Sequence, residues 1–196
     1  MKRMTQKIPT RVITLAAILT AMVVVLQLLG SFIRFGMFSV SLVLIPIVIG
    51  AATCGPLVGA WLGLAFGVTV LLSGDAAAFL TINVPGTIVT VLLKGLACGV
   101  FASLAYKALE KVNRYLAVSV AAVACPIANT GIFLLGCRLF FWDTIIAWGT
   151  AAGFPSVTAY AFLGLVGANF LFELGFNIVL SPVVVRLLNI RKKQVE

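Results

Sequence analysis

The chain has 196 residues, of which 62% are apolar and only 10% are charged. In a soluble domain of this size roughly a quarter of the residues are charged. The composition therefore excludes a soluble globular protein and indicates a protein embedded in lipid. Eleven of the fourteen Lys and Arg gather at the chain ends and in one connecting segment, a pattern of membrane orientation rather than of nucleic-acid binding. Histidine is absent, which removes the commonest metal ligand and general base. We therefore expect no metal, no cofactor and no enzyme activity.

The apolar segments predict an all-α integral membrane protein with six transmembrane helices in a single domain, residues 1–196. A span needs about 20 apolar residues to cross roughly 30 Å of hydrocarbon. The second and third spans are separated at Gly55-Pro56, because glycine and proline together favour a tight turn. The predicted spans cover approximately residues 12–33, 40–53, 56–73, 83–106, 115–141 and 158–187.

The basic residues predict the orientation of these spans. With six spans, three basic groups fall on one side of the membrane, and the opposite side holds Arg34, Asp75 and Asp143. Lys and Arg are enriched in cytoplasmic segments, so both termini are expected in the cytoplasm of a multi-pass cell-membrane protein. The basic groups are Lys2, Arg3, Lys7 and Arg11; Lys107, Lys111 and Arg114; and Arg186, Arg191, Lys192 and Lys193.

Glycines recur every four residues at the start of the third predicted span: Gly55, Gly59, Gly63 and Gly67. On a helix such residues form one stripe that lets another backbone approach closely. Two interpretations are open: the stripe packs against another helix of the same protein, or it forms a sliding contact with a partner protein.

The segment from Asp143 to about Val157 is the longest one expected outside the membrane, and it includes Trp148, Gly153 and Pro155. It is interpreted as an interfacial loop with an aromatic anchor, or alternatively as a lid.

Polar residues at membrane depth are the candidate binding residues, because lipid cannot satisfy them. In the fourth span Asn83, Thr87, Thr90 and Lys94 share one helical face, and in the sixth span Asn169, Glu173 and Asn177 share another. The fifth span adds Asn129 and Arg138.

Lys94 and Glu173 both fall near the middle of the membrane, where an unpaired charge costs roughly 3 kcal/mol or more. They are expected to face the protein interior and to neutralise one another. One interpretation is an ion pair that only fixes helix register. Two aligned polar faces together with Asn129 favour the other interpretation, a polar binding cavity.

The chain resembles a known family at several of these places. Ile45-Pro46-Ile47-Val48-Ile49-Gly50-Ala51, followed by Gly55-Pro56 and the glycine stripe, is similar to helices two and three of the substrate-binding S components of energy-coupling factor (ECF) vitamin transporters. The run from Pro126 to Phe133 and the late Ser181-Pro182 pair add to the resemblance, as do the length and the six predicted spans.

The resemblance implies a membrane-embedded subunit that binds a vitamin outside the cell and docks on a transmembrane coupling subunit with two cytoplasmic ATPase subunits. No GxxxxGK[ST] phosphate-binding loop is present, so energy for uphill transport must come from elsewhere. The family's alanine-x-x-x-alanine motif, which meets the coupling subunit, corresponds to Ala17 and Ala21.

By the same resemblance, substrate-binding residues come from the outer halves of the fourth to sixth helices. Together with the polar faces, this predicts a binding set of Asn83, Thr87, Lys94, Asn129, Arg138, Asn169 and Glu173.

The overall pattern is closest to pantothenate- or folate-type members, with pantothenate preferred; Lys94 and Arg138 would suit a carboxylate. The rival classes are a gradient-driven secondary transporter, for which no internal repeat is visible, and a membrane-embedded enzyme, for which no nucleophile and base pair is visible.

Overall fold

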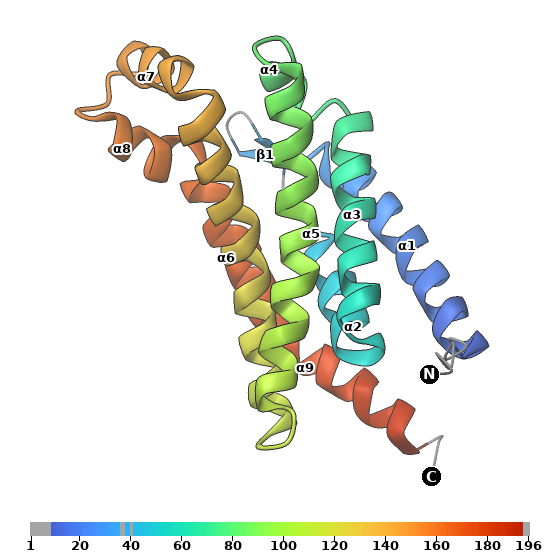
Figure 1. Cartoon of the computed structure of the whole chain (residues 1–196). Helices are drawn as coiled ribbons and strands as arrows, with labels where there is room; N and C mark the ends of the chain where they lie inside the picture. Colours follow the sequence, from blue (N-terminus) through green and yellow to red (C-terminus); the bar gives the residue numbers. More distant parts are fainter. Residues whose placement is uncertain (1–8, 36–37, 40, 194–196) are drawn as a thin grey trace, which may run out of the picture.

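A computed structural model of the chain describes residues 9–35, 38–39 and 41–193. Within that part the protein is a bundle of long helices, which confirms the all-α membrane class (Figure 1). Four helices are long and apolar enough to cross a membrane: α1 (Thr10–Gly30), α5 (Val84–Leu109), α6 (Arg114–Phe140) and the apolar part of α9 (Gly167–Lys193). They match the first, fourth, fifth and sixth predicted spans.

The second and third predicted spans are the shorter apolar helices α2 (Leu44–Cys54) and α3 (Pro56–Leu72). At about 1.5 Å per residue, α2 covers only about half of the hydrocarbon thickness, so six full spans stay a prediction. The expected start of the second span at residue 40 lies outside the described residues. Between them Gly55 takes φ 86°, a conformation that favours glycine, and Pro56 opens α3.

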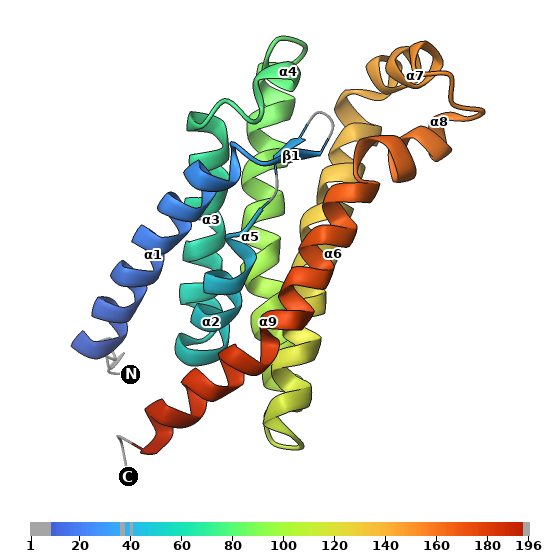
Figure 2. The ribbon, with the colours of Figure 1, turned by 180° about the vertical axis from the view of Figure 1, so that it is seen from behind.

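The segment between α1 and α2 is not helical. It forms a hairpin of two short antiparallel strands, β1 (Arg34–Phe35) and β2 (Phe38–Ser39), with Arg34 opposite Ser39. Non-helical backbone is tolerated at membrane depth only where protein or a cavity surrounds it. In both views β1 lies between α5 and α6 (Figures 1 and 2).

The segment predicted as an outer loop is helical instead. Residues 143–151 belong to α7 (Trp142–Ala151), and the following turn, with Gly153 at φ 74°, is irregular. Ile145 is fully buried in α7, and Trp148 packs on Phe79. The apolar residues of this segment therefore pack as a helix on the bundle end. Short helices α4 (Ala77–Leu80) and α8 (Val157–Ala159) lie at the same end (Figure 1).

The last span begins with a π-helix, η1 (Tyr160–Leu165), and continues as α9. Pro182 lies inside α9, and proline interrupts the helical hydrogen bonds and kinks a helix. α9 changes direction along its length (Figure 2).

Glycines bring α3 and α5 into backbone contact. A Cβ added at Gly63 would clash with the Gly95 carbonyl oxygen, and one added at Gly59 would meet the Gly99 carbonyl oxygen at 2.7 Å. The glycine stripe of α3 is thus an internal packing surface, as the first of the two sequence interpretations states. It fixes the position of α5, which carries the predicted polar face.

We predict that Gly63→Ala destabilises the protein by about 1–3 kcal/mol, because the added methyl group meets backbone that cannot move aside. Thermal unfolding in detergent measures the change. Gly131→Ala in α6 is the matched control, since nothing lies within 4 Å of its added Cβ. Equal melting temperatures for Gly63→Ala and wild type would contradict the close α3–α5 contact.

Candidate functional site

A cavity lies among α5, α6 and α9 and beneath the β-hairpin and the α3–α4 connection. The cavity has a volume of about 70 Å³ and is partly open to the outside. Five of the seven predicted binding residues line it: Thr87, Lys94, Asn129, Asn169 and Glu173. The two polar helical faces recognised in the sequence therefore meet at one cavity.

Asn83 does not line the cavity. It precedes α5, and its side-chain oxygen accepts a hydrogen bond from the Gly86 backbone N–H at 2.9 Å. Asn is a preferred residue at this capping position, particularly before a proline in the first turn. Its side chain caps the start of α5.

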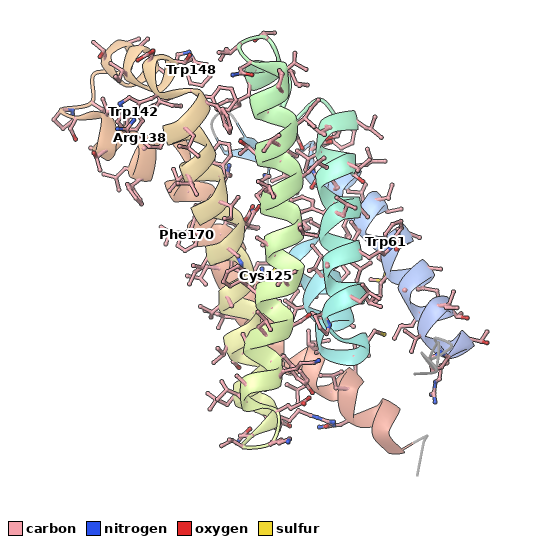
Figure 3. The ribbon with its side chains drawn as sticks, viewed as in Figure 1. Trp61, Cys125, Arg138, Trp142, Trp148 and Phe170 are labelled. Carbon is pink, nitrogen blue, oxygen red and sulfur yellow. The ribbon has the colours of Figure 1, made fainter. Side chains whose placement is uncertain are left out.

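Arg138 also lies away from the cavity. Its guanidinium carbon is 4.5 Å from the centre of the Trp142 ring, and its side chain is exposed at the end of α6. Figure 3 shows the two side chains together on the outside of the bundle. A guanidinium stacked on an indole ring is a favourable arrangement at a surface. This contact explains the position of the Arg138 side chain.

Glu173 is the most buried charged group of the site, with 4% of its surface exposed. Its carboxylate accepts hydrogen bonds from the Ser41 backbone N–H at 3.1 Å and from the Asn129 side-chain amide at 3.3 Å. Ser41 lies in the non-helical segment before α2, where its N–H is free of helical pairing. The carboxylate therefore joins this segment to α6 and α9.

Lys94 approaches the cavity from the opposite side, on α5. Its ammonium nitrogen lies 5.4 Å from the centre of the Phe66 ring and 5.6 Å from that of Phe133, close enough for cation–π attraction. The charges of Lys94 and Glu173 attract one another electrostatically. Each group also has partners of another kind: the Ser41 backbone and the Asn129 amide for Glu173, and aromatic rings for Lys94.

A second carboxylate, which the sequence-based binding set leaves out, lies at the hairpin end of the cavity. One oxygen of Asp75 accepts hydrogen bonds from the Gln27 amide at 2.6 Å, the Ser39 hydroxyl at 2.6 Å and the Ser73 hydroxyl at 3.3 Å. Gln27 and Ser39 also line the cavity. A glutamine within the apolar first span is the signal that could have indicated this cluster.

Aromatic rings cover the end of the cavity that is nearest α4 and α7. Phe79 of α4 packs edge-on against Phe133, Phe141 and Trp148, with ring centres 5.6, 4.9 and 5.5 Å apart. Three of these rings, those of Phe79, Phe133 and Phe141, line the cavity. The site therefore combines apolar walls with a few convergent polar groups, the usual composition of a small-molecule site.

Ala17 and Ala21 lie far from this cavity, on the outer face of α1. Both are exposed and line an apolar groove between α1 and α3, together with Trp61 and Leu64. The Trp61 indole N–H donates to the Thr20 hydroxyl at 3.1 Å across the groove. Figure 3 shows Trp61 on the side of the bundle that faces α1.

The sequence matches the profile of the family described as "ECF transporter, substrate-specific component" over residues 11–185. The match covers most of the chain and all the residues of both the cavity and the groove. The chain belongs to this family, whose members are substrate-binding subunits of transporters. Searches of curated proteins and of solved structures find no match.

Proposed function

We propose that this protein captures a vitamin outside the cell and delivers it through an ATP-driven ECF transporter. The observation that most directly supports this proposal is a cavity with polar residues inside an apolar helical bundle, in a chain of the substrate-specific family. The proposed partners are a transmembrane coupling subunit and two cytoplasmic ATPase subunits. The cavity binds the solute, and the coupling module supplies the energy.

The proposed orientation has both termini in the cytoplasm and the cavity open toward the outside. The start of α1, the end of α9 and the α5–α6 turn lie toward one end of the bundle, opposite α4 and α7 (Figure 1). That end carries Lys107, Lys111 and Arg114, as the positive-inside rule requires of a cytoplasmic side. Lys2, Arg3 and Lys7, which also support this orientation, lie outside the described residues.

The proposed binding set keeps Thr87, Lys94, Asn129, Asn169 and Glu173. Asn83 and Arg138 are left out of it, because helix capping and stacking on Trp142 account for them.

Pantothenate is the proposed solute, with folate or another vitamin as the alternative. Among the described lining residues, Lys94 is the one cation, and it faces two carboxylates, Asp75 and Glu173. Pantothenate carries a single carboxylate, which Lys94 can pair, whereas folate carries two. A gradient-driven secondary transporter is the competing class, and it would work without ATPase subunits.

We predict that Lys94→Met remains monodisperse in detergent but binds pantothenate about ten- to a hundredfold more weakly. Loss of a charge-assisted hydrogen bond has this effect, while the methionine keeps the apolar contact with Phe66 and Phe133. Titration calorimetry measures the affinity. Lys107→Met, on the exposed far end of α5, is the matched control and should bind as wild type does. Unchanged affinity of Lys94→Met would exclude a carboxylate partner at this position.

We predict that Ala17→Trp or Ala21→Trp abolishes transport while the isolated protein still binds its solute. A bulky side chain fills the α1–α3 groove and blocks close approach of a partner helix. Ile18→Trp is the matched control, because Ile18 is exposed on α1 but does not line the groove.

Copurification is the direct measurement for these groove variants and for the proposed function. Tagged wild-type protein should bring down a coupling subunit and two ATPases, and the alanine variants should not. If binding and complex formation are lost together, the groove is an internal packing surface. Transport by wild-type protein without any ATPase subunit would favour the secondary-transporter class.

We predict that an impermeant thiol reagent labels Ala78→Cys and Asp143→Cys in intact cells, on a cysteine-free background, and does not label Lys111→Cys. Residues 78, 143 and 111 are all exposed, so labelling reports their side of the membrane rather than burial. Asp75 is unsuitable as a labelling position, because its carboxylate accepts hydrogen bonds from three side chains and a cysteine there would remove them. Labelling at 111 alone would reverse the proposed orientation.

A further inference from the structure

Three amide oxygens in the cavity wall lack hydrogen-bond donors among the described residues. They are Gln27 Oε1, Asn129 Oδ1 and Asn169 Oδ1. The three side chains are 1%, 5% and 7% exposed, and all line the same cavity. They come from α1, α6 and α9, so their convergence is a property of the tertiary structure rather than of one helix.

The orientation of two of these amides follows from chemistry. The Gln27 NH₂ group donates to the Asp75 carboxylate, and the Asn129 NH₂ group donates to the Glu173 carboxylate. With each NH₂ group placed on a carboxylate oxygen, each amide carbonyl oxygen points away from its carboxylate partner.

Buried acceptors without donors are costly, and nearly all such groups in native proteins have a partner. The rings of Phe79, Phe133, Phe141 and Phe170 in the cavity wall carry no donors. The lining groups that can donate, among them Lys94, Thr90 and Thr130, do not bond these three oxygens. A solute bound in the cavity can supply the missing donors.

We infer that the cavity selects a solute with at least two hydroxyl or N–H donors, which pair with the oxygens of Gln27, Asn129 and Asn169. The inference rests on the proposed function and names the chemical class of its substrate. Lys94 is left to pair with an acceptor or anionic end of the same solute. A solute that carries only acceptors would leave the three oxygens unpaired, and Asp75 and Glu173 would repel it.

The first test measures thermal stability without any solute. Asn169→Leu replaces an unpaired buried acceptor by an apolar group of similar size, so its melting temperature should rise by about 2–4 °C. Asn177→Leu is the comparison, because its side-chain oxygen is also buried without a donor but Asn177 does not line the cavity. Its NH₂ group donates to the Glu173 backbone carbonyl at 2.7 Å, so this variant also loses a hydrogen bond and its melting temperature should not rise. A fall in the melting temperature of Asn169→Leu would overturn the inference.

The second test measures binding by calorimetry with pantothenate as the probe. Asn169→Leu should bind it at least about tenfold more weakly, and Asn177→Leu should bind it as wild type does. Equal binding by Asn169→Leu and wild type would contradict a donor contact at Asn169.

The third test uses unmodified protein and paired probes. Pantothenate is compared with its di-O-methyl ether, and folate with its 2-dimethylamino derivative, which lack the corresponding donors. The parent vitamin should bind at least about tenfold more tightly than its methylated form. Equal binding of a parent and its methylated form would overturn the inference while leaving the transporter function intact.

Failure of the proposed function gives a different result. If neither vitamin binds and no ATPase copurifies, the transporter proposal fails. The melting temperature of Asn169→Leu then still decides whether the cavity oxygens lack donors, with a rise supporting the inference and a fall overturning it.

Discussion

The buried carboxylate of Glu173 sets the constraint on which the site depends. In lipid every polar group must find its partner within the protein, and this side chain is only 4% exposed. The backbone N–H of Ser41 and the side-chain amide of Asn129 donate hydrogen bonds to it. A backbone N–H can serve a carboxylate only where it is not already paired in a helix. The non-helical segment before α2 and the shortness of α2 itself are consistent with this requirement.

The close packing of α5 against its two neighbours determines where the Lys94 side chain points. α5 meets α3 through Gly95 and Gly99, whose lack of side chains allows backbone contact. It meets α6 where Thr90 packs on Gly136. With both neighbours held this closely, Lys94 is directed into the space between them. There the Phe66 and Phe133 rings contact its ammonium group and stabilise its charge.

The cavity and the α1–α3 groove lie on different parts of the molecule, and this separation suits a subunit that binds and is driven by others. Ala17 and Ala21 face outward from α1, while Gln27, nearer the end of the same helix, faces inward to Asp75. One helix thus contributes to both surfaces. A shift in the position of α1 would reach the Asp75 cluster directly, because the Gln27 amide joins the two.

Several features were predictable because they depend on local sequence. Apolar runs of sufficient length located the helices to within a few residues, since the bilayer requires such lengths. Helical spacing placed Thr87 and Lys94 on one face and Asn169 and Glu173 on another. The helix α7 was missed, because its burial comes from contact with Phe79, a residue more than sixty positions earlier in the chain.

The sequence by itself determined the membrane class, the order of the helices and most of the polar groups of the cavity, because hydropathy and helical periodicity are local properties. Only the tertiary structure decided which of these groups meet. It gave Glu173 a backbone hydrogen-bond partner in the segment before α2, and it brought Asp75 to the site through Gln27. It also left Arg138 outside on Trp142. Hydrogen bonds and ring contacts across many residues depend on how helices are oriented about their axes, and no local pattern encodes that orientation.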